Sequence, residues 1–284
     1  MSSQMKLGLA QISGEPYAVG VNRSRCEDAL VHAFGEGADL VVLPELIVSG
    51  YGTDASRISA IAEPVPGPTT EAWVRIARAS DGYIVGGLCE RDGERLFNTA
   101  VAVGPEGVIG HYRKAHLFAE EKRTFAPGDL GFPLVATRFG TIGLCVCYDL
   151  RFVEVVRLMA LQGAELICVP TAWLPGFDEQ RWDSEGMSPQ GRGAEVQANL
   201  NQVFIAAASQ VGRHGENDFL GSSILVDPKG GRVIGPLSGS KEEVAFGTID
   251  LTLVRRAQAR GDLITPRADR RTDIYGIVVG DRVL

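Results

Sequence analysis

The sequence predicts a layered α/β fold in which strands and helices alternate along the whole chain. Short runs rich in Val, Ile and Leu are separated by segments with helical periodicity, a pattern typical of sheets flanked by helices. The 284 residues are 45% apolar, which is enough for a sizeable core and too much for a disordered chain. No Ser/Gly-rich linker or block of charge divides the sequence, so we predict a single domain over residues 1–284.

Individual elements follow from the period of the apolar residues. Leu40–Pro44 has no polar position, as expected of a parallel strand covered on both faces. Apolar or alternating runs bounded by turn residues predict strands at Lys6–Gln11, Leu40–Pro44, Tyr83–Cys89, Asn98–Val103, Thr141–Cys147, Leu166–Pro170, Phe204–Gln210, Ser223–Val226 and Val244–Ile249. Apolar residues at helical spacing predict helices at Val21–Gly35, Thr69–Ser80, Phe152–Gln162, Gly191–Asn201 and Leu251–Ala259.

The two halves of the chain resemble each other in sequence. GADLVVLP at 37–44 recurs as GAELICVP at 163–170, VIG at 108–110 recurs at 233–235, and KLGL at 6–9 resembles TIGL at 141–144. The matches keep one order, which predicts two similar halves related by a pseudo-two-fold axis. The two halves differ at polar positions: in this alignment, Glu45 corresponds to Thr171 and Cys147 corresponds to Ile12. A site grafted onto one half of a repeated scaffold would look like this.

Charge and composition exclude several classes of partner. The net charge of −7 argues against nucleic acid, whose binding depends on Lys and Arg contacts to phosphate. No apolar run is long enough to span a membrane, and residues 1–8 lack the layout of a signal peptide. The five cysteines are odd in number and lie mostly in apolar runs, which indicates reduced thiols in a cytoplasmic protein.

Cys147 stands where an apolar run ends and a polar turn begins. The predicted strand Thr141–Cys147 is followed by Tyr148 and Asp149, and then by a helical pattern. A thiol at a strand end next to a helix N-terminus is expected to favour the thiolate, which attacks carbonyl and nitrile carbons. Cys145 lies deeper in the apolar run and is predicted to be a core residue.

Two further polar groups follow apolar runs. Glu45 comes directly after Leu40–Pro44, and a carboxylate at the carboxyl end of a buried parallel strand is expected to lie in a crevice. Lys114 follows the run at 108–113, but spacing alone does not choose among Arg113, Lys114 and His116. A thiol, a carboxylate and an amine that converge could act as nucleophile, general base and oxyanion stabiliser.

Taken together, the three segments resemble the nitrilase superfamily of carbon–nitrogen hydrolases, in its amidase/carbamoylase-like branch. Pro44-Glu45 is similar to the glutamate motif of that family, residues 112–117 to its lysine motif, and residues 147–152 to its cysteine motif. The resemblance runs from Lys6 to Gly276, which predicts a core at about 6–276 and a tail at 277–284. The segment 121–129 resembles the loop with the family's second glutamate. Glu120 and Glu121 both suit that role, and the distance to Pro127-Gly128 favours Glu121.

The resemblance implies a four-layer α-β-β-α sandwich and a homodimer or higher homo-oligomer that pairs through a helical surface. It also implies a thiol amidohydrolase that acts without metal or cofactor. Glu45 would serve as general base, Cys147 as nucleophile, and Lys114 with the Tyr148 backbone N–H as oxyanion donors. Glu121 would orient Lys114 or the amide nitrogen.

The implied substrate is a small aliphatic amide, which would be hydrolysed to a carboxylic acid and ammonia. The alternative is an N-carbamoyl amine or amino acid, but carbamoyl-D-amino-acid hydrolases carry two arginines after the nucleophile, and this chain has Leu150 and Arg151. Nitriles are less favoured, because true nitrilases usually have Trp where Tyr148 stands. Candidate substrate-binding residues are Tyr51, Tyr148, Arg151, Thr171, Ala172 and Trp173.

The segment 176–192 lacks clear periodicity and is predicted to be a loop over the site. Arg181 and Arg192 in that loop are interpreted as solvated surface arginines rather than carboxylate ligands. The loop is therefore a candidate specificity element, without an assigned contact.

Other site types match the sequence poorly. The four histidines form neither His-x-His nor His-Glu-x-x-His, so no metal site is predicted. Gly-x-Ser-x-Gly is absent, and Gly35-x-Gly37 lacks the third glycine of a dinucleotide-binding fingerprint. The main rival from another class is a non-catalytic binding protein on the same scaffold, which the intact Glu45, Lys114 and Cys147 disfavour.

Overall fold

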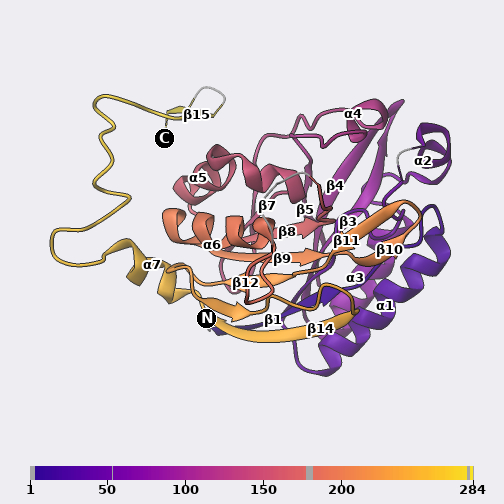
Figure 1. Cartoon of the computed structure of the whole chain (residues 1–284), viewed down its shortest axis with the longest axis horizontal. Helices are drawn as coiled ribbons and strands as arrows, with labels where there is room; N and C mark the ends of the chain where they lie inside the picture. The colour runs from indigo at the N-terminus through magenta and orange to yellow at the C-terminus, as the bar shows by residue number, and fades with distance from the viewer. Residues whose placement is uncertain (1–3, 53, 177–181, 280–281, 284) are drawn as a thin grey trace.

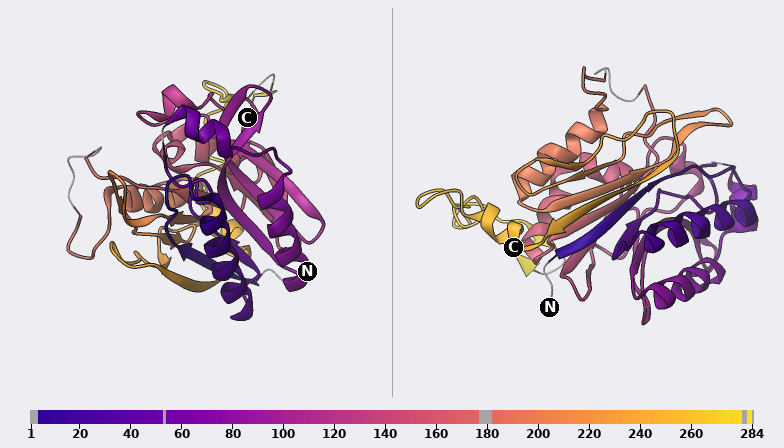
Figure 2. Two further views of the ribbon diagram at one scale, coloured as in Figure 1. Left: turned by 90° about the vertical axis from the view of Figure 1, so that its right-hand side faces the viewer. Right: turned by 90° about the horizontal axis from the view of Figure 1, so that it is seen from below.

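The computed structural model describes residues 4–52, 54–176, 182–279 and 282–283. Two six-stranded sheets lie face to face between two layers of helices (Figures 1 and 2). The first sheet contains β1 (Gln4–Gln11), β2 (Leu40–Val42), β3 (Tyr83–Asp92), β4 (Arg95–Gly104), β5 (Gly107–Arg113) and β14 (Glu243–Asp250). The second contains β6 (Leu134–Ala136), β7 (Thr141–Leu144), β8 (Leu166–Thr171), β9 (Phe204–Ser209), β12 (Ile224–Val226) and β13 (Arg232–Ile234).

Two long helices cover the outer face of each sheet. The helices α1 (Val19–Gly35) and α3 (Pro68–Ser80) pack on the first sheet, and α5 (Val153–Gln162) and α6 (Pro189–Asn201) pack on the second (Figure 2). Shorter helices are α2 (Ala55–Ile61), α4 (Glu121–Thr124), α7 (Thr252–Gln258) and the 3₁₀ helix η1 (Cys147–Arg151). Pro68 begins α3 and Pro189 begins α6, at positions where a missing backbone N–H costs nothing.

Side chains of the first sheet alternate between two apolar layers. Leu7 and Leu9 of β1 and Leu40 of β2 face the second sheet, in an apolar cluster that also includes the strands of that sheet and the buried residues of α5 and α6 on its outer face. Val41 of β2 faces the other way, into the layer beneath α1 and α3. The sheet is thus buried on both faces, which explains why its strands read as continuous apolar runs. The predicted α-β-β-α sandwich is confirmed.

The strand order also confirms the predicted pseudo-symmetry. The first sheet runs β14-β1-β2-β3-β4-β5, and the second runs β6-β7-β8-β9-β12-β13. The matching sequences fall on equivalent strands, namely β1 with β7, β2 with β8, and β5 with β13. The strand β6 follows β5 in the chain but pairs with β7, and β14 follows β13 but pairs with β1. Each half therefore completes the other half's sheet.

All the predicted strands and helices are present, with ends shifted by a few residues. The difference that matters most for the site is at Cys147, which was predicted to end a strand. The strand β7 ends at Leu144, and Cys147 instead begins η1 with a φ of 46°. The strand β5 was expected only as the run at 108–113 before Lys114. Sequence patterns did not predict the short elements α2, α4, η1, β6 and β13, the hairpin of β10 (Val211–His214) and β11 (Asn217–Leu220), or the pair β15 (Val278–Val279) and β16 (Arg282–Val283). These segments are too short for an apolar period to emerge.

Beyond α7, the C-terminal segment runs away from the sheets along the side of α5 and α6 (Figure 1). Apolar side chains on this segment are exposed, including Leu263 at 93% and Ile274 at 71%. Within the described ranges, no helix is both long enough and apolar enough to cross a membrane.

Gly87 of β3 packs directly against the chain that follows β2. A Cβ atom at this position would lie 2.5 Å from the backbone nitrogen of Leu46 and 2.7 Å from Cα of Glu45. Backbone atoms cannot rotate away as a side chain can, so an added methyl group must displace the strand end.

We therefore expect Gly87→Ala to lower the free energy of unfolding by about 1–3 kcal/mol, measured by urea denaturation. The matched control is Gly20→Ala in α1, where a Cβ would meet nothing within 4 Å and alanine favours the helix. Equal stability of the two variants would show that the strand end moves freely.

Candidate active site

Glu45, Lys114 and Cys147 come from three different strand ends and meet between the sheets. Glu45 follows β2 and Pro44, Lys114 directly follows β5, and Cys147 begins η1 shortly after β7. Glu45 and Lys114 are fully buried, with 0% and 1% exposure, whereas Cys147 is half-buried. The charges of Glu45, Lys114 and Glu121 all act on the Cys147 thiol, so the structure brings together the groups that the sequence left far apart.

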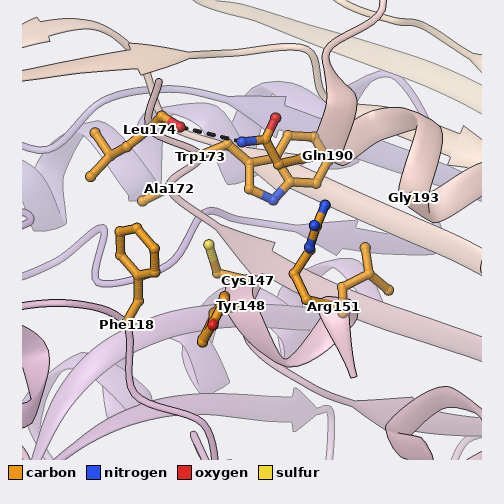
Figure 3. A pocket seen from close by; sticks show the side chains of 10 residues that line it. Phe118, Cys147, Tyr148, Arg151, Ala172, Trp173, Leu174, Gln190 and Gly193 are labelled. Atoms are coloured by element: carbon orange, nitrogen blue, oxygen red, sulfur yellow. Dashed lines mark hydrogen bonds between the residues drawn. The ribbon is translucent and has the colours of Figure 1, made fainter. Parts of the chain in front are cut away.

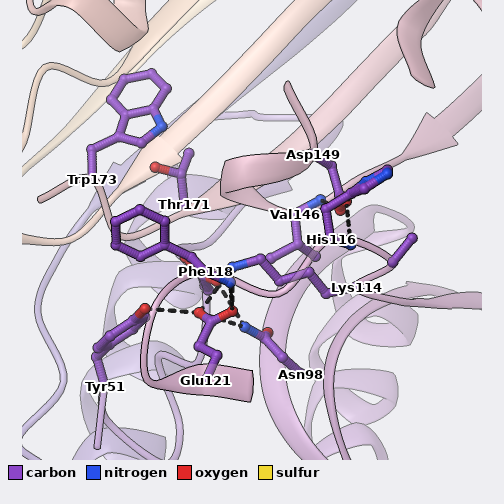
Figure 4. Close-up of polar contacts among 12 residues, drawn as sticks. Tyr51, Asn98, Lys114, His116, Phe118, Glu121, Val146, Asp149, Thr171 and Trp173 are labelled. Carbon is purple, nitrogen blue, oxygen red and sulfur yellow. Dashed lines mark hydrogen bonds and ion pairs between the residues drawn. The ribbon is translucent and has the colours of Figure 1, made fainter. Parts of the chain in front are cut away.

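Lys114 lies between two buried carboxylates. Its Nζ is 2.7 Å from Oε1 of Glu45 and 2.8 Å from both oxygens of Glu121 (Figure 4). Tyr51 donates from its hydroxyl to Oε1 of Glu121 at 2.7 Å, and the Phe118 backbone N–H donates to Oε2 at 2.9 Å. These contacts fix Glu121 by four donor–acceptor pairs, while one oxygen of Glu45, Oε2, has no partner among the described residues.

The charges in this cluster do not balance. Two carboxylates share one ammonium, so burial, with the negative charge of Glu121, raises the pKa of Glu45 to about 7 despite the opposing effect of Lys114. Burial by itself would lower the pKa of Lys114, but Glu121 and Glu45 outweigh it and raise that pKa. Near neutral pH, the lysine is therefore charged, and Glu45 is poised to take up or release a proton.

The expectation that the Cys147 thiolate is favoured is wrong for the free protein. Burial is the main cause that raises the pKa of Cys147, and the carboxylate of Glu45 adds to it. Lys114 and a hydrogen bond from the Ala172 backbone N–H act in the opposite direction but are outweighed. Cys147 also opens a short 3₁₀ helix rather than the long helix α5, so the expected helix-terminus effect is weak.

The second half of the chain holds the backbone of Glu45. The Glu45 N–H donates to the carbonyl of Thr171 at 3.3 Å, and the Gln210 side chain donates from Nε2 to the carbonyl of Glu45 at 2.8 Å. Leu46, the next residue, has a φ of 47°, so the chain turns sharply once it has delivered the carboxylate. Thr171 thus contacts the predicted base through its backbone.

Asp149 holds the turn that carries Cys147. One oxygen of its buried carboxylate accepts hydrogen bonds from the Val146 backbone N–H and the Tyr112 hydroxyl, both at 3.0 Å. The other accepts from the His116 backbone N–H at 3.0 Å and contacts His116 Nδ1 at 2.8 Å. The lysine segment and the cysteine turn are therefore tied together by one carboxylate.

The choice among the three basic residues is now clear from their contacts. His116 belongs to the Asp149 network, and Arg113 forms ion pairs with Glu90, Asp92 and Asp129 on the other side of the strand. Of these three residues, Lys114 alone contacts Glu45.

The two adjacent glutamates are also distinguished by their contacts. Glu121 is 1% exposed and contacts Lys114, while Glu120 is exposed and pairs with Arg123. Glu121 is therefore the one that joins the cluster around Lys114.

An apolar cavity opens above the sulfur of Cys147 and has a volume of about 40 Å³ (Figure 3). It holds more than one water molecule, which needs about 10–15 Å³ by the same measure, but it leaves little room beyond a few heavy atoms. Four of the predicted binding residues line it, namely Tyr148, Arg151, Ala172 and Trp173, together with Phe118, Leu150, Leu174, Gln190 and Gly193.

Tyr51 lines a neighbouring groove instead, on the far side of Glu121, together with Phe118 and Leu174. Trp173 is 3% exposed and belongs to the core between the sheets, so it is both a core residue and a wall of the cavity. Its burial is therefore compatible with the predicted role of substrate-binding residue.

The predicted loop 176–192 is shorter than expected. The helix α6 begins at Pro189, where the Ser188 side chain accepts a hydrogen bond from the Gly191 N–H, so Arg192 is helical and pairs with Asp183. Arg181 lies outside the described residues. Among the described residues, no group of three or more His, Cys, Asp and Glu side chains is arranged to hold a metal ion.

Two residues of this site were missed by the sequence analysis. Asn98 in β4 donates from Nδ2 to Oε1 of Glu45 at 2.7 Å, and Gln210 holds the Glu45 backbone. Both are buried amides within or directly after apolar strand segments, which is the signal that could have identified them.

The carbon–nitrogen hydrolase family model matches residues 6–259 of this chain. A protein named nitrilase from Pyrococcus abyssi is 37% identical over 273 residues, which cover 95% of this chain and 99% of that protein. An (R)-stereoselective amidase from Pseudomonas sp. is 32% identical, with 91% and 89% covered, and the omega-amidase of Homo sapiens is 30% identical, with 90% and 91% covered.

Solved structures resemble the whole chain as well. The amidase from Nesterenkonia sp. superimposes with a TM-score of 0.76 at 27% identity, covering 95% of this chain and 94% of that chain. Saccharomyces cerevisiae Nit3, a member of the nitrilase superfamily, gives a TM-score of 0.80 at 27% identity, with 93% and 96% covered. In a variant of the Nesterenkonia amidase, acrylamide has undergone Michael addition to the active-site cysteine.

Exposure predicts that one cysteine reacts with iodoacetamide in the folded protein. Cys147 is half-buried, whereas Cys26, Cys89, Cys145 and Cys168 are buried. We expect a single carboxamidomethyl group at Cys147 by peptide mass spectrometry, added faster as pH rises from about 7 to 9, because the pKa of this thiol is raised. Cys147→Ala should gain no label until it is unfolded in urea, and label on a different cysteine in the native protein would contradict this picture.

Proposed function

Since the chain belongs to the carbon–nitrogen hydrolase family and is a hydrolase of carbon–nitrogen bonds, we propose that it converts small aliphatic amides to carboxylic acids and ammonia. The reaction passes through a thioester between the acyl group and Cys147. Glu45, Lys114 and Glu121 are the other members of the catalytic set.

One observation carries this proposal: the half-buried thiol of Cys147 lines a small apolar cavity and feels the charge of Glu45, whose Oε2 has no partner among the described residues. The pKa of Glu45, at about 7, suits a group that must both accept and return a proton near neutral pH. A non-catalytic binding protein would have no use for a buried carboxylate held in this state, because the missing partner costs free energy.

The first half of the reaction forms the thioester. Glu45 takes the thiol proton, and the sulfur of Cys147 attacks the carbonyl carbon of the amide. The oxygen of the tetrahedral intermediate is held by the ammonium of Lys114 and the backbone N–H of Tyr148. The carbon–nitrogen bond then breaks, and protonated Glu45 gives its proton to the departing nitrogen, so that ammonia leaves.

The second half regenerates the enzyme. Glu45, again ionised, takes a proton from water, and the resulting hydroxide attacks the thioester carbonyl. The carbon–sulfur bond breaks, the carboxylic acid forms, and the proton returns to Cys147. Glu121 touches Lys114 at 2.8 Å and keeps its ammonium oriented through both halves.

The cavity favours a small acyl chain. Trp173, Leu174 and Phe118 supply apolar walls, and Leu150 occupies the position where a second arginine would be needed to hold an N-carbamoyl amino acid. The alternative substrate class, N-carbamoyl compounds, would have Arg151 as its single charged ligand in the cavity. Relatives named omega-amidase and nitrilase make dicarboxylate monoamides and nitriles the other classes to compare.

We further propose that residues 1–284 form one domain that assembles as a homodimer or higher homo-oligomer. Exposed apolar side chains support this assembly: Val196 and Leu200 on α6 are 51% and 52% exposed, and Leu263 and Ile274 of the C-terminal segment are exposed as well. The backbone of that segment lies on the same side of the molecule as α6 (Figure 1). We also propose a cytoplasmic location, because the five unpaired cysteines suit a reducing compartment, and cell fractionation tests it.

The function is tested by measuring ammonia release from butyramide, a dicarboxylate monoamide, an N-carbamoyl amino acid and a nitrile. We expect turnover to be highest on the simple amide and undetectable in Cys147→Ala, because the covalent route disappears with the sulfur. Mass spectrometry of the wild-type enzyme should detect the acyl adduct on Cys147. Activity of Cys147→Ala, with its fold verified by circular dichroism, would rule out the mechanism.

The assembly is tested by light scattering. The wild-type protein should have at least twice the 30.4 kDa mass of one chain. The double variant Val196→Glu, Leu200→Glu should shift toward the monomer, because charge at a buried contact is unfavourable. Val21→Glu, at an exposed position on α1 (59%), is the control and should leave the mass unchanged. A monomeric wild-type protein would refute the proposal.

A further inference from the structure

The two carboxylate oxygens of Glu45 have unequal surroundings. Oε1 accepts hydrogen bonds from Lys114 Nζ and from Asn98 Nδ2, both at 2.7 Å. Oε2 is buried and has no hydrogen-bond partner among the described residues. The two donors therefore crowd onto one oxygen and leave the other available to a proton donor that arrives from the thiol, the substrate or water.

Asn98 is well placed to impose this asymmetry. Asn98 lies in β4 and pairs with Cys89 of β3. Its backbone carbonyl accepts a hydrogen bond from the backbone N–H of Lys114 at 2.8 Å, so the position of Asn98 is fixed relative to the lysine. Its side chain is 1% exposed and points toward the pair formed by Lys114 and Glu121, with Nδ2 3.4 Å from Oε1 of Glu121 (Figure 4). The reversed amide would place an oxygen against two carboxylates, so the donor side must face them.

We propose that Asn98 is a positioning residue for the catalytic base: together with Lys114 it occupies Oε1 of Glu45 and so presents Oε2 as the oxygen that exchanges protons. Lys114 alone would not achieve this. Its ammonium is shared with Glu121 and would follow the carboxylate of Glu45 if that group rotated. A second donor, rigidly held on a neighbouring strand, removes that freedom. This inference rests on the proposed function, in which Glu45 is the general base.

The same contact also affects proton affinity. A donor that points at a carboxylate stabilises its ionised form, so Asn98 acts against the burial that raises the pKa of Glu45 to about 7. Loss of this donor should therefore raise that pKa further. Because Glu45 must be ionised to accept the thiol proton, the fall in activity on the acid side of the pH profile should move to higher pH.

The test is Asn98→Leu, which keeps the shape of the side chain and removes the donor. We expect the acid limb of kcat/KM for butyramide to move up by about one pH unit from its wild-type midpoint near 7. Such a shift lowers kcat/KM about fivefold at pH 7, because the ionised fraction of the base falls, and nearly restores it at pH 9. KM should change little, because Asn98 does not line the cavity. Asn98→Ser, whose hydroxyl is too short to reach Glu45, carries the same expectation if the leucine variant does not fold.

The matched control is Thr99→Val on the same strand. Thr99 is 0% exposed and donates to Oε2 of Glu90 at 2.7 Å, outside the active site. Its loss should lower stability without moving the pH midpoint. An unchanged midpoint in both Asn98 variants would overturn the proposal.

A second readout separates this inference from the proposed function. If the wild-type enzyme hydrolyses none of the amides, the function fails, but the rate of Cys147 alkylation against pH still reports on Glu45, whose charge acts on the thiol. In Asn98→Leu, the pH at which ionisation of Glu45 changes the alkylation rate should then be higher than in the wild-type protein. An unchanged pH would contradict the role of Asn98, whatever the outcome of the amide assays.

Discussion

The structure of the site depends on one buried ammonium group that serves two buried carboxylates. Lys114 contacts both Glu45 and Glu121, so the cluster carries an excess negative charge in a region from which water is largely excluded. Burial is the main cause of the two perturbations, and the excess negative charge adds to it: the pKa of Glu45 is raised to about 7, and the pKa of Cys147 is raised as well. In the proposed reaction, the negative charge moves onto the substrate oxygen near Lys114, which relieves the imbalance as the tetrahedral intermediate forms.

The pseudo-symmetric scaffold makes such a cluster possible. The strands β2 and β8 occupy equivalent positions in the two sheets, and their carboxyl ends meet where Glu45 hydrogen-bonds to Thr171. Gln210, which follows β9, reaches across to the carbonyl of Glu45. One half therefore supplies the base together with Lys114 and Asn98, and the other half supplies the nucleophile and the contacts that hold the backbone of the base. The exchanged strands β6 and β14 prevent the halves from separating without breaking both sheets.

Sequence patterns predicted the parts of this fold that depend on apolar periodicity. The runs at Leu40 and Leu166 are buried on both faces, and they could be recognised because every position is apolar. The thiol's ionisation was predicted in the wrong direction, because the sequence shows that a helix follows Cys147 but not that burial and Glu45 outweigh it. Spacing alone did not identify the basic residue, because Arg113, Lys114 and His116 differ in their partners, which come from distant segments. The choice of Lys114 came from the family resemblance.

The raised pKa of Glu45 also has a cost for stability. A carboxyl group whose pKa is higher in the folded than in the unfolded state binds its proton more tightly when folded, so its contribution to stability falls as pH rises from about 4 to 7. Lys114 has a raised pKa, and its favourable contribution persists throughout that window. The fold thus tolerates a carboxylate that becomes unfavourable at the pH where the proposed base must be ionised. Asn98 reduces this penalty without supplying a second positive charge, which would hold Glu45 ionised and deprive it of the ability to return its proton.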